Sequence, residues 1–313
     1  MKTNPFPYSD NNKRYHTYAY ALKQRFGGRV SRISLNAGFT CPNLDGSRGT
    51  GGCSYCTPMG SGEFAGDPIL SISEQFMQVA ERIEKKWSTS RHIAYFQAHT
   101  NTYGSVERLR TIYQQGLDCP GVVGLAISTR PDCLPADVCD LLEEISRKTY
   151  LVVELGLQSI HDVTAQRINR CHTYQEFLEG YWRLVNRGIL VGVHLIDYLP
   201  EESREMMLET VYQVGQLHPH LVKIHLLHLL RGTKMASEYF DKPWMLPTME
   251  DYIQLVCDQL ELLPPEVILG RVTGDGIPDQ LVAPTWSLQK RKILNGIDQE
   301  LARRDSWQGK RLS

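Results

Sequence analysis

The stretch RISLNAGFTCPNLDGSRGTGGCSYCTPMGSG, residues 32–62, begins as an apolar strand and continues as a loop that carries three cysteines. Cys41, Cys53 and Cys56 have the spacing C-x11-C-x2-C, and four glycines lie between the first two. Thiolates are strong metal ligands, and glycine lets a backbone bend closely around a bulky inorganic group. The loop therefore indicates a metal centre directly after the first strand of the fold.

The number of cysteines bears on the kind of centre. A structural zinc site takes four ligands, usually from two C-x2-C pairs, whereas only Cys53 and Cys56 form such a pair here. A cubane iron–sulfur cluster held by three cysteines leaves one iron open to a small molecule. The other cysteines are single and scattered, and we interpret them as packing residues: Cys119, Cys133, Cys139, Cys171 and Cys257.

The composition is that of an ordinary globular enzyme. Of 313 residues, 42% are hydrophobic and the net charge is −1, so the protein as a whole has no basic field that would attract nucleic acid. No apolar run approaches about 20 residues, so no membrane partner is expected. The first residues lack the apolar core of a secretory signal, which predicts a cytoplasmic protein with reduced thiols.

Short apolar runs alternate with amphipathic ones along most of the chain. Strands are predicted at 32–37, 92–97, 122–128, 150–158, 189–196 and 221–229, and helices at 71–87, 105–116, 135–148, 173–188 and 203–217. The runs are nearly continuous in apolar residues, as in parallel strands covered on both faces. Ser73 before Glu74 is a plausible start for the first of these helices. Six tandem repeats predict an α/β fold, a partial (βα)6 TIM-like barrel with a C-terminal α/β extension.

Three regions are expected along the chain: a basic N-terminal segment (1–30), the core barrel (31–235) and an extension that caps it (236–313). Residues 231–248, which cross the boundary between the last two regions, are predicted to form a loop. Residues 11–44 contain six Lys or Arg, several aromatics and no acid, and the tail from 289 is again basic. Such segments can grip phosphates and stack on bases, although solvated helix faces explain them equally well.

Polar side chains at the ends of the predicted strands are the candidate site residues. They are Gln97, Thr100 and Asn101 after the second strand, Ser128 and Arg130 after the third, and Glu154 and Gln158 in the fourth. Glu154 lies in an apolar strand, where a carboxylate is costly unless it faces a polar lumen or a donor. The structural alternatives are a core salt bridge for Glu154 and an Arg130–Asp132 pair. His194, His225 and His228 could line a pocket or be satisfied core residues.

With its cysteine loop after the first strand of a parallel barrel, the chain resembles the radical S-adenosylmethionine (SAM) enzymes over roughly 30–235. Its loop differs in length from their commonest C-x3-C-x2-C form. The segments YFQAHTNTYG, ISTRPDCLP, VELGLQS, HLIDYLPEE, KIHLLHLLRGT and ILGRVTGDGIP resemble the Elongator catalytic-subunit-like branch, and within it the YtqA/MnmL–YhcC type. Tyr198 and Glu201 depart from that pattern, because they replace the usual glycines.

The resemblance implies a [4Fe-4S] cluster on Cys41, Cys53 and Cys56 and S-adenosyl-L-methionine as cosubstrate. It places SAM contacts at Tyr55, Gln97, Thr100 and Asn101, although packing within the loop explains Tyr55 almost as well. Ser128, Arg130, Glu154 and Gln158 are further candidates for binding SAM because of their positions in the strands. An electron donor such as flavodoxin or ferredoxin would drive homolysis of SAM to a 5′-deoxyadenosyl radical. The implied substrate is a tRNA wobble uridine, with the 5-substituent converted from carboxymethylaminomethyl to aminomethyl. The basic terminal segments would then hold the anticodon arm.

Two other functions remain open at this point. A radical SAM enzyme that acts on a small metabolite or a peptide would show no affinity for RNA. A zinc-stabilised binding protein without catalysis would carry zinc and no iron. No catalytic residue beyond the cofactor contacts is assigned.

Overall fold

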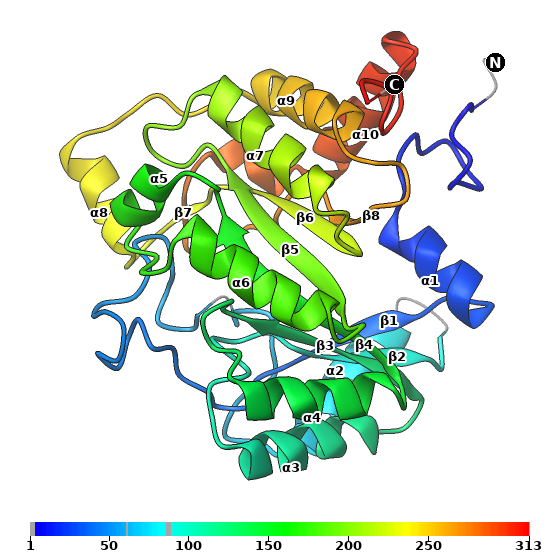
Figure 1. Cartoon of the computed structure of the whole chain (residues 1–313). Helices are drawn as coiled ribbons and strands as arrows, with labels where there is room; N and C mark the ends of the chain where they lie inside the picture. The colour runs from blue at the N-terminus through cyan, green and yellow to red at the C-terminus, as the bar shows by residue number, and fades with distance from the viewer. Residues whose placement is uncertain (1–3, 61, 86–88, 313) are drawn as a thin grey trace.

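Seven apolar segments pair side by side as one curled parallel sheet (Figure 1). The structure is a computed structural model, and it describes residues 4–60, 62–85 and 89–312. The strands are β1 (Ser31–Leu35), β2 (His92–Phe96), β3 (Val122–Thr129), β4 (Tyr150–Gln158), β5 (Leu190–Asp197), β6 (Leu221–Leu226) and β8 (Ile268–Arg271), in that order. The predicted α/β partial barrel is confirmed. Its six predicted strands lie within a few residues of their observed bounds.

The seventh strand comes from the region expected to cap the barrel. β8 pairs parallel with β6, with Ile268 opposite Leu221 and Leu269 opposite Val222. The C-terminal region therefore widens the sheet itself as well as covering it. A separate antiparallel pair forms from β7 (Leu229–Leu230) and β9 (Leu281–Ala283).

Amphipathic helices cover the outer face of the sheet (Figure 1). They are α2 (Ile72–Glu84), α3 (Val106–Leu117), α4 (Ala136–Ser146), α6 (Tyr174–Val185), α7 (Arg204–Gln216) and α9 (Met249–Glu261), with α10 (Lys290–Arg303) packed on α9. Their apolar stripes meet the outward-facing strand residues in one continuous core. Residues 86 and 87 of the helix predicted at 71–87 lie outside the described residues.

The start of α2 corrects the sequence prediction. Its N-cap is Ser71 and not Ser73: the Ser71 hydroxyl accepts from the amide of Glu74 (3.2 Å), and the Glu74 carboxylate accepts from the amide of Ser71 (2.8 Å). This reciprocal pair is a capping box, in which the acid lies three positions after the cap. Ser73, only one residue before Glu74, cannot form it.

The region 231–248 is not a continuous loop as predicted. It contains α8 (Lys234–Asp241), which begins after Thr233, whose hydroxyl accepts from the amide of Ala236 (3.1 Å). Met235 and Ala236 are buried. A second short helix that was not predicted, α5 (Asp162–Arg167), follows β4. Both lie near the cysteine loop at one end of the barrel (Figure 1).

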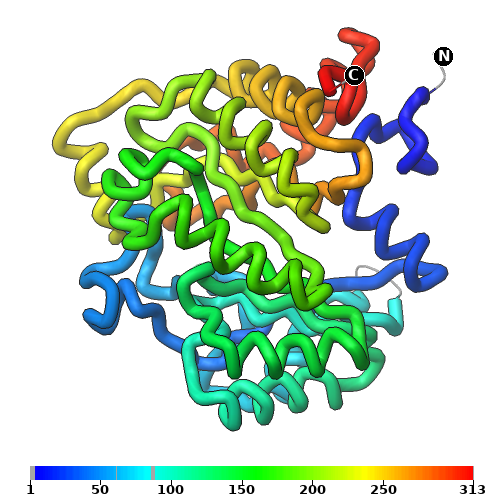
Figure 2. The backbone as a smooth tube through the Cα atoms, in the orientation of Figure 1, coloured from blue at the N-terminus to red at the C-terminus, as the bar shows by residue number. Residues whose placement is uncertain are grey.

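The inner face of the sheet is closed near its amino ends by the N-terminal segment. Leu22 of α1 (Tyr18–Phe26) packs with Tyr95, Ala126 and Val152, which project inward from three strands. The chain before α1 lies beside the C-terminal turn (Figure 2), where the amide of Gln308 donates to the carbonyl of Arg14 (2.9 Å). No helix among the described residues is long and apolar enough to cross a membrane.

Candidate functional site: the cysteine loop and the barrel lumen

The cysteine loop leaves β1 at the carboxyl edge of the sheet and folds on itself through short turns. The carbonyl of Cys41 accepts from the amide of Leu44 (2.8 Å), and that of Cys53 accepts from the amide of Cys56 (3.0 Å). The two glycines directly before Cys53 have φ values of 78° and 74°, in the left-handed region that glycine adopts without strain. Glycine is therefore needed where the loop turns back toward the second cysteine.

Segments distant in sequence hold this loop in place. The side-chain amide of Asn169 donates to the carbonyl of Gly52 (2.7 Å). The backbone of Ser54 donates to the carbonyl of Ile168 (2.9 Å) and accepts from the amide of Met235 at the start of α8 (2.8 Å). The loop is thus bonded to the ends of both short helices that the sequence did not predict.

The three thiols are free and partly buried. A hydrogen bond from Cys56 lowers the pKa of Cys53 to about 6, and the charge of Arg130 lowers it as well against the effect of burial. The side-chain amide of Asn43 lies 3.6 Å from the Cys53 sulfur and donates to it. Electropositive surroundings and an amide donor suit thiolates that bind a metal centre.

Arg130 is buried and its guanidinium fork is engaged by Asp132, with Nε–Oδ1 at 2.9 Å and Nη2–Oδ2 at 2.8 Å. It also donates to the carbonyls of Arg170 (2.8 Å) and Cys171 (3.2 Å). The structure thus shows the salt bridge that was the alternative interpretation. Contact with a SAM carboxylate stays a prediction that would need Arg130 to exchange partners.

The loop after β2 joins the cysteine loop to β3. The amide of Thr100 donates to the carbonyl of Thr40 (3.2 Å), and the side chain of Asn101 donates to the carbonyl of Ser128 (2.9 Å). The backbone amide of Gln97 donates to the carbonyl of Leu35 at the end of β1 (3.2 Å). These three predicted cofactor contacts therefore lie together beside the cysteines. Thr100 and Asn101 are buried, and their binding of SAM stays a prediction.

Glu154 is the centre of a buried charged network inside the barrel. Its Oε1 accepts from Arg32 (2.8 Å), and its Oε2 lies 2.5 Å from the ammonium of Lys223 and 2.8 Å from Nε2 of His194. Burial alone would raise the pKa of Glu154, but Arg32 and Lys223 hold it well below its ordinary value. The structure shows Glu154 in a salt bridge that faces the lumen, and not as an unpaired carboxylate. A contact between Glu154 and SAM stays a prediction.

The network continues across the floor of the barrel through Tyr95. Its hydroxyl lies 3.2 Å from the ammonium of Lys223 and 2.7 Å from the hydroxyl of Ser128, and its ring lies 3.8 Å from Cζ of Arg32. Burial and then the charge of Arg32 lower the pKa of Lys223 to about 7. Ser128, one of the predicted contacts, therefore lies in the same chain of polar groups as Glu154.

The candidate histidines lie next to this network. The rings of His194 and His225 are 5.4 Å apart, and burial lowers the pKa of His194 to about 4, so it is neutral near pH 7. Burial also lowers the pKa of His228 to about 4. Gln158 ends β4 with a φ of 62°. Tyr55 packs against the buried cluster that includes Met235, the packing role that was its alternative, and its contact with adenine stays a prediction.

Sequence reasoning missed the partners of Glu154 and the clamp on the loop. Lys223 and Arg32 are cations inside apolar strands, as Glu154 is an acid inside one, and that pattern was the available signal. Asn169 gave no signal of its own, because its role depends on a fold that brings it to residue 52. Among the described residues, no three His, Cys, Asp or Glu side chains are placed to share a single metal ion. The cysteines of a cubane bind different iron atoms, so the donor set, the charge of Arg130 and the Asn43 amide fit such a cluster.

The comparisons with known proteins agree on the family. The profile of the Radical SAM superfamily matches residues 46–213, and that of the Radical_SAM C-terminal domain matches residues 219–303. The chain is 48% identical over 310 residues to the uncharacterized protein YtqA of Bacillus subtilis, covering 99% of this chain and 96% of that one. It is 37% identical over 266 residues to protein YhcC of Escherichia coli, covering 85% of each.

A solved structure shares the fold. The archaeal Elp3 of Methanocaldococcus infernus, with its N-terminus deleted, superposes with a TM-score of 0.69 at 17% identity, over 89% of this chain and 64% of that one. The chain therefore belongs to the radical SAM superfamily and, within it, to the family of YtqA and YhcC. Enzymes of this superfamily use a [4Fe-4S] cluster and SAM.

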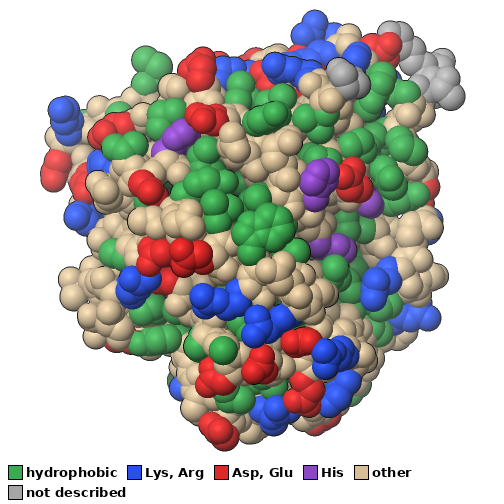
Figure 3. Space-filling view, viewed as in Figure 1, with side chains coloured by type: hydrophobic (Ala, Val, Ile, Leu, Met, Phe, Trp, Pro, Cys, Tyr) green, Lys and Arg blue, Asp and Glu red, His purple; other side chains and the backbone are tan. Residues whose placement is uncertain are grey.

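Much of the basic charge expected to meet RNA is paired within the protein. Arg304 bonds to Asp258 (2.5 Å) and Glu300 (2.7 Å), and Lys13 bonds to Asp298 (2.6 Å). Basic and acidic side chains also alternate over the helical face in Figure 3. The terminal segments are therefore not uniform basic patches, and any binding of RNA has to use particular cations.

Proposed function

We propose that Cys41, Cys53 and Cys56 bind a [4Fe-4S] cluster and that the enzyme uses it with SAM to modify the 5-substituent of a tRNA wobble uridine, from carboxymethylaminomethyl to aminomethyl. When bound, the cluster supplies the electron that cleaves SAM to a 5′-deoxyadenosyl radical, which abstracts hydrogen from a C–H bond. The observation that carries the proposal is the clamped three-cysteine loop at the carboxyl edge of a parallel half-barrel.

The chain's own residues would position the reactants and exclude water. The loop after β2 and the end of β3 lie beside the cysteines, where Gln97, Thr100, Asn101 and Ser128 would hold SAM. The buried Glu154 network fixes the polar floor beneath them, because fully paired charges in a low-dielectric site hold one geometry. A small flavodoxin or ferredoxin would deliver the electron from outside.

The radical chemistry is tested by anaerobic reconstitution with iron and sulfide. We expect wild-type protein to take up both and to release 5′-deoxyadenosine from SAM once reduced, and we expect Cys41→Ser, Cys53→Ser and Cys56→Ser each to abolish this release. Cys119→Ser, at a buried cysteine outside the loop, is the matched control and should keep it. Iron uptake that survives all three loop changes together would contradict the ligand assignment.

The substrate is tested in cells. Nucleosides of tRNA from cells with and without the gene should differ in the wobble uridine, with the carboxymethylaminomethyl form accumulating in its absence. The three cysteine variants should fail to restore the normal profile, whereas Cys119→Ser should restore it. An unchanged nucleoside profile would refute the tRNA substrate. The radical SAM activity would then need a different substrate.

A further inference from the structure

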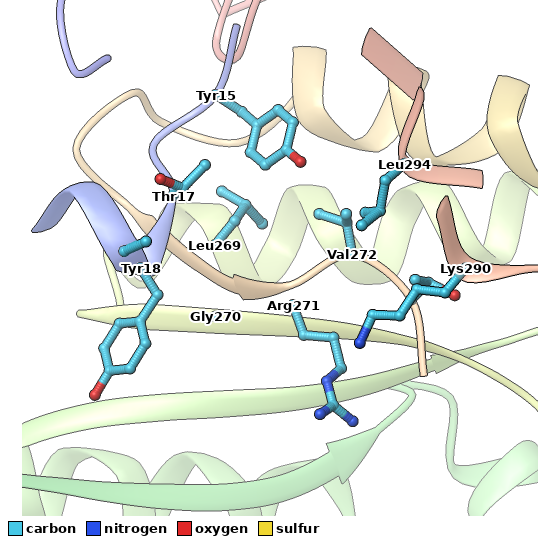
Figure 4. A pocket seen from close by; sticks show the side chains of 11 residues that line it. Tyr15, Thr17, Tyr18, Leu269, Gly270, Arg271, Val272, Lys290 and Leu294 are labelled. Carbon is cyan, nitrogen blue, oxygen red and sulfur yellow. The ribbon is translucent and has the colours of Figure 1, made fainter. Parts of the chain in front are cut away.

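A pocket of about 280 Å³ opens at the side of the barrel, between the start of α1, the last strand β8 and the start of α10 (Figure 4). Tyr15 and Leu294 lie on one side of it, and Arg271 and Lys290 reach toward the other. Tyr18, also in its lining, has its ring 5.4 Å from Cζ of Arg32. The pocket therefore adjoins the charged lumen but is formed by residues to which the cofactor assignment gives no role.

Its charges are out of balance. The carboxylate of Asp275 receives both cations: Arg271 Nη2 lies 3.0 Å from Oδ2, and Lys290 Nζ lies 2.5 Å from Oδ1. Both cations remain partly exposed, at 35% and 41% of the side chain. Two cations that share one carboxylate keep a net positive charge, and side chains exposed to this extent can turn to a second anion.

The first turn of α10, the helix that supplies Lys290, carries charges that its amino end repels. α10 has no side-chain cap and no acid in its first turn, which instead reads Lys290, Arg291 and Lys292. The amino end of a helix carries partial positive charge, so cations there repel it and an anion is attracted. By contrast, α2, α6 and α9 begin with capping boxes that include an acid.

A buried hydroxyl in the lining lacks a partner. Thr273 is 1% exposed, and its Oγ1 makes no hydrogen bond of normal geometry to a described residue, although the Tyr252 hydroxyl lies beside it. The nearby hydroxyl of Tyr252 donates instead to the carbonyl of Val272 (3.0 Å). Buried polar groups in native proteins nearly always have a partner, so an unpaired one in a pocket wall points to a ligand atom.

We propose that this pocket binds a phosphate group of a nucleotide. Arg271 and Lys290 would pair with its oxygens in place of Asp275, while the amino end of α10 and the hydroxyl of Thr273 donate to it. The phosphate can come from the backbone of an RNA or from a free nucleotide. Only the expectation that RNA is the source rests on the proposed function.

Binding is measured with two probes: a fluorescein-labelled RNA hairpin with an anticodon loop, followed by anisotropy, and uridine monophosphate, followed by calorimetry. Arg271→Gln and Lys290→Gln should each weaken binding by roughly tenfold, the usual effect of losing a charge-assisted contact. For RNA they should also reduce the slope of log K against log salt by about one. Arg303→Gln, at the other end of α10 and paired with Glu300, is the matched control and should change neither.

Asp275→Asn separates a ligand site from a structural ion pair. Removing the competing carboxylate should tighten binding of phosphate by roughly threefold to tenfold. A purely structural role predicts no tightening. Circular dichroism of each variant checks that the fold is kept.

The two proposals can fail separately. Uridine monophosphate that binds with this dependence on Arg271, Lys290 and Asp275, while the RNA hairpin does not bind, supports the phosphate site and counts against tRNA. RNA that binds with the same affinity to the wild type, Arg271→Gln and Lys290→Gln overturns the phosphate site and leaves the tRNA proposal standing. The phosphate site is also overturned if neither probe binds to the wild type. It is overturned as well if the Asp275→Asn variant binds each probe no more tightly than the wild type does.

Discussion

The ammonium of Lys223 in β6 lies 2.5 Å from the carboxylate of Glu154 in β4, across the intervening strand β5. The β5 residue in register with Glu154 is Gly192, where an added Cβ would lie only 3.1 Å from Cγ of Glu154. The missing side chain on β5 leaves the space through which two strands that do not pair exchange a buried ion pair. This contact joins the two halves of the curled sheet from inside.

Glu154→Gln should therefore destabilise the fold, because it leaves Arg32 and Lys223 buried without their counter-charge. Breaking one side of a buried ion pair typically costs about 3–5 kcal/mol. Urea unfolding followed by circular dichroism measures the change. Glu201→Gln, which removes an exposed carboxylate paired with Arg167, is the control and should have little effect. Equal stabilities for the two variants would show that the lumen tolerates the unpaired cations.

Asp197 at the end of β5 should make stability fall as the pH rises toward neutrality. Burial raises its pKa to about 7, although Gln259 donates a hydrogen bond to it (2.7 Å). Between about pH 4 and pH 7 the folded state then keeps a proton that the unfolded state has lost, so ionisation favours unfolding.

Asp197→Asn removes that ionisation. Relative to wild type, its free energy of unfolding should rise by about 2–3 kcal/mol between pH 5 and pH 8, measured by urea unfolding at both pH values. A difference that is independent of pH would show that Asp197 is ionised in the folded protein throughout this range.

Asn169→Ala and Asn169→Gly should both loosen the cysteine loop, because each removes the side-chain donor to Gly52. Asn169 has a φ of 53°, which alanine adopts at a cost of about 1–2 kcal/mol and glycine at almost none. We expect Ala to be the less stable of the two by about 1 kcal/mol in thermal or urea unfolding. Limited proteolysis of residues 40–60 should accelerate for both variants, and unchanged cleavage would count against the clamp.

Ser71→Ala should lower stability by about 1 kcal/mol, the usual effect of losing an N-cap hydroxyl. Ser73→Ala changes a serine two residues later in the same helix and serves as the control, with an expected change near zero. The comparison by urea unfolding tests the cap directly, and a larger effect at Ser73 would contradict the observed helix start.

The sheet could be predicted because its strands are recognisable from the local sequence alone. The apolar runs at 150–158 and 122–128 coincide with β4 and β3 almost to the residue, since strands covered on both faces need continuous apolar sequence. Whether residues 268–271 pair with β6 or only cover it depends on a contact with residues far away in the chain. α8 escaped prediction because its eight residues lie between a glycine and a proline and bury only two side chains.

The side chains of the candidate site could be singled out from the sequence, whereas their partners could not. Three cysteines and a carboxylate in an apolar strand were visible, because such residues are costly or unusual where they stand. That Arg130 meets Asp132, and that Glu154 meets Arg32 and Lys223, depends on side-chain directions set by the curled sheet. Sequence spacing alone does not determine those directions.

The clamp on the cysteine loop has a consequence for the order in which the enzyme is made. The ribosome completes residues 41–56 well before it reaches Asn169 and Met235, whose bonds hold that loop in shape. A nascent chain therefore presents its three thiols long before it can constrain them. If these thiols bind the proposed cluster, the contacts that shape its loop are complete only once α8 has been synthesised, so iron and sulfide would be inserted after that point.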